Sequence, residues 1–270
     1  MLNASPDLMV MMQAARAAGD GLKAHFARLS ELTVRSKSGP ADLVSIADEE
    51  AERSIRRMLS AARPEYGFLG EESGTFEGSD GGHTWIVDPL DGTTNFLFGS
   101  PLWGVNIALA REGRVVAGVT SLPMLDEFYV AELGGGAWCN ERRIRVSARG
   151  RLIEAVLACG IPFAGKPDHP LFAREMALLT EVTAGIRRTG ACSVDMAWVA
   201  AGRWDAYWER ALMAWDMAPG VILVQEAGGV ATGVDGGPLD LDGGNVCVSN
   251  GVIQAPLVDV LNRVRNEGGH

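Results

Sequence analysis

The most constraining feature of this chain is a short apolar run that leads directly into two carboxylates. Trp85-Ile86-Val87 predicts a buried strand, and Asp88-Pro89-Leu90-Asp91-Gly92-Thr93 follows it without a break. Pro89 fixes its own φ and lacks an N–H group, so the chain turns after Asp88 and brings Asp91 back beside it. Gly92 allows close approach of the backbone to a ligand, and Thr93 begins a helix whose free N–H groups favour an anion.

Two carboxylates at this separation repel one another, and each raises the pKa of the other unless a cation lies between them. Their hard oxygen atoms select Mg²⁺, Mn²⁺ or Ca²⁺ over metals that prefer thiolates. A cation beside free backbone N–H groups makes a phosphate site. Taken alone, the segment is also typical of an ordinary Asp-Gly turn in which Asp88 caps a helix.

Two further acidic segments change this balance. Gly70-Glu71-Glu72-Ser73-Gly74 places paired glutamates in a loop bounded by glycines, and Trp215-Asp216-Met217 places an aspartate at the start of an apolar helix. Each has an ordinary alternative, which is a solvated loop charge for the glutamates and a helix N-cap for Asp216. An N-cap and a metal ligand are not exclusive, so both alternatives stay open at this point.

Composition limits the function classes. The 270 residues carry 24 Lys and Arg against 34 Asp and Glu, a net charge of −10. This excess disfavours a nucleic-acid partner, and an acidic enzyme that acts on a phosphorylated substrate needs a cation. The chain has no signal peptide and no apolar run long enough to span a membrane, so we expect a cytoplasmic protein. The spacing of Cys139, Cys159, Cys192 and Cys247 fits reduced thiols rather than a CxxC motif.

The hydrophobic pattern predicts helices over residues 6–29, 46–62, 170–183, 193–201, 216–227 and 253–265. Strands are predicted at 85–87, 128–132, 155–159, 205–208 and 246–249, with a hairpin whose strands are 105–110 and 115–120. A β-meander in the first half gives way to alternating strands and helices near residues 147–151. We therefore expect a single domain over 1–270 with a soft seam at 147–151.

Three segments together resemble the signatures of a known family. They are Gly-Glu-Glu-Ser at 70–73, Trp-Ile-Val-Asp-Pro-Leu-Asp-Gly-Thr-Thr-Asn-Phe at 85–96, and Trp-Asp-Met-Ala-Pro-Gly with Glu-Ala-Gly-Gly at 215–229. Their order and spacing resemble those of the inositol monophosphatase family, and of its bacterial members most of all. The resemblance implies the layered αβαβα sandwich, of mixed α+β and α/β character, that this family shares with fructose-1,6-bisphosphatase. It also implies Mg²⁺-dependent, lithium-sensitive hydrolysis of a phosphomonoester by a homodimer, with two or three Mg²⁺ per site that Mn²⁺ can replace.

The resemblance also implies roles for individual residues. The implied metal ligands are Glu71, Asp88, the Leu90 carbonyl, Asp91 and Asp216. Thr93, with Asp48 behind it, matches the pair that orients the attacking water, and Glu71 and Asp91 are expected to act in catalysis beside them. The implied substrate contacts are Gly92, Thr93, Glu209, Asp216 and the ring-lining loop of Gly190, Ala191, Cys192 and Ser193. Lys37 is a further possible contact near the metal loop.

The alcohol part of the substrate is less constrained. Pro219 and Ile161 depart from residues common in the family, which leaves the choice of alcohol open. Glu209 and the short loops favour a small phosphorylated polyol, with inositol 1-phosphate first. Histidinol phosphate, fructose 1,6-bisphosphate and 3′-phosphoadenosine 5′-phosphate are alternatives on the same fold. A regulatory binding protein with secondary phosphatase activity is an alternative from another class. Residues 160–166 fit GxxxxGK, but Pro167 replaces the Ser or Thr of a nucleotide-binding loop, so a substrate-side loop or a simple connector is the better interpretation.

Overall fold

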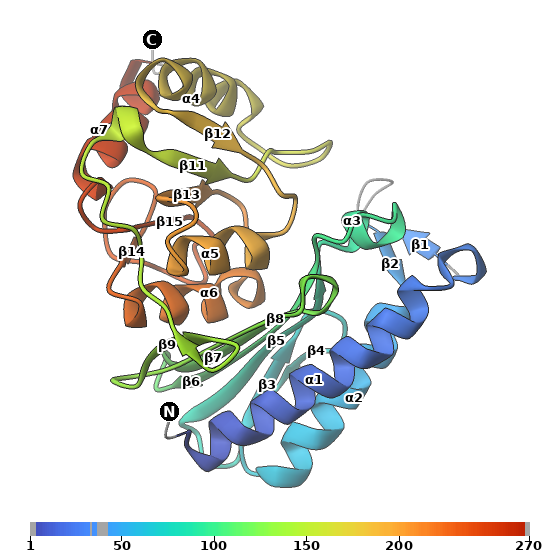
Figure 1. The fold of residues 1–270 in the computed structure, drawn as a ribbon. Helices are drawn as coiled ribbons and strands as arrows, with labels where there is room; N and C mark the ends of the chain where they lie inside the picture. The colour runs from blue at the N-terminus through green and yellow to red at the C-terminus, as the bar shows by residue number, and fades with distance from the viewer. Residues whose placement is uncertain (1–3, 33, 37–42, 268–270) are drawn as a thin grey trace.

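The protein is described from a computed structural model that covers residues 4–32, 34–36 and 43–267, so Lys37 lies outside the described residues. Figure 1 shows five layers that follow one another across the molecule: two helices, a sheet, two helices, a second sheet and two helices. This is the predicted αβαβα sandwich. The first sheet comes from the N-terminal half of the chain and the second from the C-terminal half. The middle pair of helices lies between the two sheets.

The first sheet has eight described strands in the order β10-β9-β8-β7-β6-β5-β3-β4. Its strands are β3 (Gly67–Gly70), β4 (Gly74–Phe76), β5 (His83–Asp91), β6 (Gly104–Arg111), β7 (Arg114–Leu122), β8 (Glu127–Glu132), β9 (Gly136–Cys139) and β10 (Arg142–Arg143). The predicted hairpin is present as β6 and β7, which pair antiparallel. β3 and β5 run parallel, so the segments that follow them emerge at the same edge.

Two N-terminal helices cover the outer face of this sheet (Figure 1). They are α1 (Pro6–Phe26) and α2 (Ile46–Ala62), and the short strands β1 (Val34–Ser36) and β2 (Leu43–Ser45) form a hairpin between them. α1 ends earlier than predicted because the chain tightens into a 3₁₀ turn at Leu29–Glu31. Their apolar faces and the sheet enclose a continuous core that includes Leu22, Ile55 and Trp85.

The second sheet has five described strands in the order β12-β11-β13-β15-β14. Its strands are β11 (Val156–Cys159), β12 (Gly185–Arg187), β13 (Ala206–Glu209), β14 (Val230–Thr232) and β15 (Val246–Ser249). The helices α4 (His169–Val182) and α7 (Gln254–Glu267) cover its outer face, while α5 (Cys192–Ala200) and α6 (Ala214–Glu226) lie between the sheets (Figure 1). The short α3 (Thr93–Leu97) follows β5 directly.

The middle layer packs closely on the first sheet. A methyl group at Gly118 of β7 would lie 2.5 Å from the Ile222 side chain and 3.0 Å from Pro219 of α6, so glycine is needed there. α6 continues through Pro219 without interruption. This contact fixes α6, which carries Asp216, against the sheet whose strand β5 carries Asp88 and Asp91.

The predicted seam falls between the two sheets, since β10 ends at Arg143 and β11 begins at Val156. Asp205 holds this connection in place. Its buried carboxylate accepts a hydrogen bond from the Ser147 hydroxyl and another, of 2.7 Å, from the Val156 backbone N–H. Within the described part of the chain, no helix has the length and apolar character needed to cross a membrane.

Candidate active site

The end of β5 carries two of the predicted ligands. Asp88 is 1% exposed, and its Oδ1 accepts a hydrogen bond of 2.9 Å from the Leu90 N–H. The pairing of β5 with β6 shifts between Asp88 and Asp91, and this irregularity brings the second carboxylate onto the same side. Gly92 follows with φ of 86°, a left-handed conformation that lets the chain enter α3 at once. Asp88 is thus a strand residue and not a helix cap.

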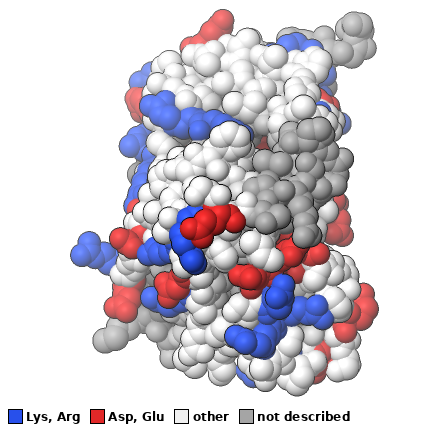
Figure 2. All heavy atoms as spheres, turned by 90° about the vertical axis from the view of Figure 1, so that its right-hand side faces the viewer, with Lys and Arg blue, Asp and Glu red and all other residues white. Residues whose placement is uncertain are grey.

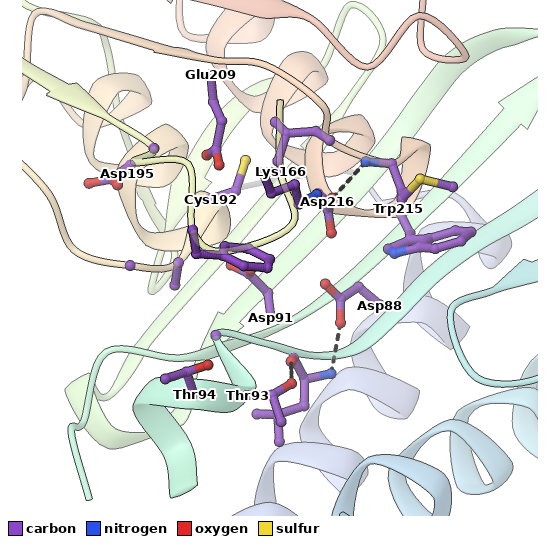
Figure 3. Close-up of a pocket in the computed structure, with 18 of the residues that line it drawn as sticks. Asp88, Asp91, Thr93, Thr94, Lys166, Cys192, Asp195, Glu209, Trp215 and Asp216 are labelled. Carbon is purple, nitrogen blue, oxygen red and sulfur yellow. Dashed lines mark hydrogen bonds between the residues drawn. The ribbon is translucent and has the colours of Figure 1, made fainter. Parts of the chain in front are cut away.

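Asp216 reaches the same point from the other half of the chain. It is the third residue of α6, and its Oδ2 accepts the Met213 N–H at 2.7 Å. One carboxylate oxygen from each of Asp88, Asp91 and Asp216 lies within 4.8 Å of the other two. Figure 3 shows Asp88 and Asp216 pointing towards one another from β5 and α6. Asp216 therefore both caps its helix from inside the first turn and takes part in the cluster.

Burial and mutual repulsion destabilise the ionised forms of these carboxylates. The pKa of Asp88 is raised well above its usual value by burial and by the nearby charges of Glu71, Asp91 and Asp216. Burial raises the pKa of Asp91 to about 6 and also raises that of Asp216. Among the described residues, no Lys or Arg side chain forms an ion pair with any of the three aspartates. A cluster of hard anionic ligands to which no described Lys or Arg is paired fits a divalent cation.

Thr93 and Asp48 meet beside this cluster, as their predicted joint role requires. The Thr93 hydroxyl lies 3.1 Å from Asp48 Oδ1 and 3.1 Å from the Leu90 carbonyl oxygen. Asp48 is fully buried at the start of α2, where its Oδ2 accepts hydrogen bonds from the Ser45 N–H and hydroxyl at 2.9 and 2.7 Å. Burial raises the pKa of Asp48, although these hydrogen bonds oppose the shift. The local fold thus fixes both partners.

Glu71 follows β3 and approaches the cluster from the neighbouring parallel strand. Its backbone N–H donates to the Val87 carbonyl at 3.2 Å, which extends the pairing of β3 with β5 by one residue. Its side chain lines the same cavity as Asp88, Leu90, Asp91 and Asp216. All five predicted metal ligands therefore lie together, although they come from three separate segments.

The carboxylates line one part of a cavity of about 680 Å³, and Glu209 lies across it from Asp88 (Figure 3). Cys192 also lines the cavity, next to Asp91, whose carboxylate accepts a hydrogen bond from the Cys192 backbone. Glu209 ends β13 and points into the cavity (Figure 3). The Tyr207 hydroxyl donates a hydrogen bond to the Glu209 carboxylate, and burial raises the pKa of Glu209 to about 7. Cys192 begins α5, and burial raises the pKa of its thiol well above the usual value, so it is not a thiolate at neutral pH.

The ring-lining loop divides between two positions. Gly190, Ala191 and Cys192 line the cavity. Ser193 is 2% exposed and lies behind Asp91, where its backbone N–H donates to Asp91 Oδ2 at 2.6 Å and its hydroxyl donates to the same oxygen. In this geometry Ser193 holds Asp91, and its predicted contact with the substrate stays a prediction.

Sequence reasoning missed several residues of this site. Gly160 faces Glu209 so closely that a methyl group there would lie 1.8 Å from the carboxylate carbon. Phe163 and Lys166 also line the cavity, so the segment 160–166 forms part of its wall. Asp195 also lines the cavity, and burial raises its pKa to about 8. The GxxxxGK pattern of residues 160–166 had singled out this segment as a substrate-side loop or a connector, but the contact of Gly160 with Glu209 depends on β11 lying beside β13.

Figure 2 shows the face of the molecule that looks to the right in Figure 1. Acidic and basic side chains are interspersed over the part of this face that the structure describes, and neither sign forms a continuous field.

Comparisons with known proteins agree with this geometry. Residues 3–266 match the model of the inositol monophosphatase family. An inositol-1-monophosphatase of Caulobacter vibrioides is 50% identical, over 93% of this chain and 99% of that protein. The Nus factor SuhB of Pseudomonas aeruginosa is 42% identical, over 91% of this chain and 92% of that protein. The crystal structure of the extragenic suppressor protein suhB from Bartonella henselae superposes with a TM-score of 0.93 at 46% identity, over 96% of this chain and 99% of that one.

The fold and the buried carboxylate cluster define a metal-dependent hydrolase. The match over nearly the whole chain makes the assignment specific: the chain belongs to the inositol monophosphatase family.

Proposed function

We propose that this protein hydrolyses myo-inositol 1-phosphate to inositol and phosphate in a Mg²⁺-dependent reaction. One observation carries the proposal: Asp88, Asp91 and Asp216 cluster within 4.8 Å on one side of a cavity that holds Glu209 on its other side. The first group suits a cation and a phosphate, and the second suits a hydroxyl-bearing alcohol. Relatives about half identical in sequence are named inositol-1-monophosphatase, which supports this choice of alcohol.

Different residues of the site are proposed to bind the metal, to orient the attacking water and to contact the phosphate. Glu71, Asp88, Asp91, Asp216 and the Leu90 carbonyl would hold Mg²⁺. When bound, Mg²⁺ supplies positive charge to the phosphate oxygens and lowers the pKa of water. The Thr93 hydroxyl, bonded to Asp48, is placed to orient the attacking water and pass its proton to that carboxylate. The backbone at Gly92 and Thr93 lies on the cavity wall, where it can contact the phosphate.

Glu209 is proposed to accept a hydrogen bond from a hydroxyl group of the alcohol. Its carboxylate is fixed by Tyr207 on one side and has Gly160 on the other, so it offers a rigid acceptor. Cys192 packs beside the ring. Burial raises the pKa of the Cys192 thiol, which disfavours Cys192 as a nucleophile and supports direct attack by water.

Phosphate release from a small panel tests the proposal. The panel contains inositol 1-phosphate, histidinol phosphate, fructose 1,6-bisphosphate and 3′-phosphoadenosine 5′-phosphate, each with Mg²⁺, with Mg²⁺ and Li⁺, and with EDTA. We expect the highest kcat/KM for inositol 1-phosphate, with inhibition by Li⁺ and no release in EDTA. A preference for another substrate would refute the assignment of the alcohol, and equal release in EDTA would refute the role of the metal.

The number of metal ions, the oligomeric state and the location in the cell are proposed from the resemblance to the family. Each site would take two or three Mg²⁺, Mn²⁺ would replace them, and the protein would be a cytoplasmic homodimer. Metal titration by calorimetry and light scattering of the purified protein test the stoichiometry and the oligomeric state.

A regulatory role is the second candidate, and one observation favours it. The relative from Pseudomonas aeruginosa is named a Nus factor, and it matches this chain along nearly its whole length. A deletion strain complemented with Asp91→Asn would separate the two functions. Full rescue by a protein without turnover would support regulation, whereas failure to rescue beside a rescuing wild type would support catalysis.

A further inference from the structure

A second buried carboxylate lies one helical turn beyond Asp48 on α2. Glu52 is only 3% exposed, and it is four residues from Asp48, so both side chains project from the same face of the helix. A buried carboxylate is costly unless it is hydrogen-bonded. Its environment therefore shows what it stabilises.

The partner of Glu52 is the loop that carries Glu71. Glu52 Oε2 accepts a hydrogen bond of 2.8 Å from the backbone N–H of Glu72. The carboxylate also fills the space over Gly70, where a methyl group would lie 2.6 Å from the same oxygen atom. The glycine before the paired glutamates is therefore needed because Glu52 occupies the place of its side chain.

These contacts bracket the backbone of Glu71. Its own N–H donates to the Val87 carbonyl of β5 at 3.2 Å, and the next N–H along the chain donates to Glu52. Both peptide groups that flank the Glu71 side chain are thus fixed, one by the sheet and the other by α2. The direction in which Glu71 enters the cavity follows from these two hydrogen bonds.

We propose that Glu52 is a positioning residue for the metal site, which acts by holding the 70–72 loop so that the Glu71 carboxylate is aimed at Asp88. α2 then supports two parts of the site from one face: Asp48 holds Thr93 and Glu52 holds Glu71. The inference rests on the proposed function, since it takes Glu71 as a metal ligand. Removal of residues that orient metal ligands costs about 10- to 100-fold in metal affinity.

Binding of Mn²⁺ to the full-length protein, followed by electron paramagnetic resonance without substrate, tests this. Glu52→Leu removes the acceptor at similar volume, and Glu52→Gln keeps an oxygen that can accept from the Glu72 N–H. Glu50→Leu and Glu50→Gln are matched controls on the same helix, because the Glu50 carboxylate is half-exposed and contacts His25 instead. Circular dichroism shows which variants fold. If Glu52→Leu does not fold, Glu52→Asn replaces it, because the asparagine side chain is polar but too short to reach the Glu72 N–H.

We expect Glu52→Leu to weaken Mn²⁺ binding by about 10- to 100-fold. Glu52→Gln and both Glu50 variants should stay within about threefold of wild type, and saturating Mg²⁺ should restore most of the kcat of Glu52→Leu. Folded Glu52→Leu or Glu52→Asn with wild-type Mn²⁺ affinity would overturn the inference while leaving the metal site intact. A wild-type protein that binds no Mn²⁺ would overturn the metal site as well.

Discussion

The two sides of the cavity are built in different ways. The carboxylate side, formed by Glu71, Asp88, Asp91 and Asp216, is anchored by hydrogen bonds to β5, to the start of α6 and to the chain behind Asp91. The Glu209 side, formed by Glu209 and residues 160–166, has one fixed carboxylate and a wall that includes the exposed side chain of Phe163. This difference implies that the first side sets the reaction and the second selects the alcohol. Variants on the two sides should therefore have separable effects.

Asp91→Asn should have the largest effect, because it removes one anion from the cluster. We expect kcat/KM for every substrate to fall by about 10²–10⁴-fold, since a bound metal ion supplies several kcal/mol of transition-state stabilisation. The metal-free protein should be at least as thermostable as wild type, because repulsion within the buried cluster decreases. Phosphate release and thermal unfolding in EDTA measure both effects. Asp259→Asn, an exposed aspartate on α7, is the matched control, and turnover near wild type would refute the ligand assignment.

Thr93→Ala should come next. Loss of the hydroxyl that bonds Asp48 should lower kcat by about 10²–10³-fold, within the range of general acid–base catalysis, and leave KM within a few-fold. Thr93→Ser keeps the hydroxyl and should recover much of the rate. Steady-state kinetics with both variants check this, and an unchanged kcat in Thr93→Ala would exclude a role in orienting water.

Glu209→Gln should impair recognition of the alcohol and leave the chemistry at the carboxylate side unchanged. We expect KM for inositol 1-phosphate to rise about tenfold, equivalent to a hydrogen bond to a charged group. A substrate without ring hydroxyls, such as p-nitrophenyl phosphate, should keep its kcat and KM within about twofold. Gly160→Ala should resemble Glu209→Gln, because the added methyl group displaces the carboxylate. Equal losses for both substrates would show that the two sides do not act separately.

The stability of the metal-free protein should depend on pH in an unusual direction. Burial raises the pKa of Asp91 to about 6, of Glu209 to about 7 and of Asp195 to about 8, whereas such carboxylic acids ordinarily titrate at about pH 4 in water. The folded protein therefore binds more protons than the unfolded chain between about pH 4 and pH 8, so its stability falls as the pH rises through this window. We expect the free energy of unfolding in EDTA to fall by about 2 kcal/mol or more from pH 5 to pH 8. For a chain of this size, a loss of about 2 kcal/mol lowers Tm by about 4–8 °C.

Saturating Mg²⁺ should remove much of this pH dependence, because the cation favours the ionised carboxylates. A Tm in EDTA that rises steadily from pH 5 to pH 8 would contradict the assignment of uncompensated buried carboxylates.

Cys192→Ala should have the smallest effect. The thiol lines the cavity but its pKa is raised by burial, so we expect kcat to change by less than about threefold and KM to change slightly. Kinetics on inositol 1-phosphate measure this. A loss comparable to that of Thr93→Ala would point to a covalent mechanism instead.

The sequence predicted the carboxylate side better than the Glu209 side for a physical reason. Asp88 and Asp91 lie three residues apart at the end of a predicted strand, so a local irregularity of β5 is enough to bring them together. Glu71 follows β3, a short strand that the sequence did not predict. The helix over 46–62 was predicted to the residue, since it has a strong amphipathic pattern and a Ser45 cap. Short strands such as β9, β12 and β14 were missed, because three or four residues carry too little periodicity.

What the sequence could not give depends on tertiary contacts. Ser193 was placed near the substrate, but α5 is turned so that it bonds Asp91 from behind. The roles of Gly160 and Glu52 depend on the distance to a strand or loop far away in sequence, and no local signal carries that distance.

Anomalous diffraction from crystals grown with Mn²⁺ and inositol 1-phosphate tests the central claim most directly. The account predicts anomalous peaks bounded by Glu71, Asp88, Asp91 and Asp216, with the phosphate beside them and a ring hydroxyl against Glu209. Peaks located elsewhere, or an inositol ring that does not contact Glu209, would contradict the division of the cavity into a reacting side and a selecting side.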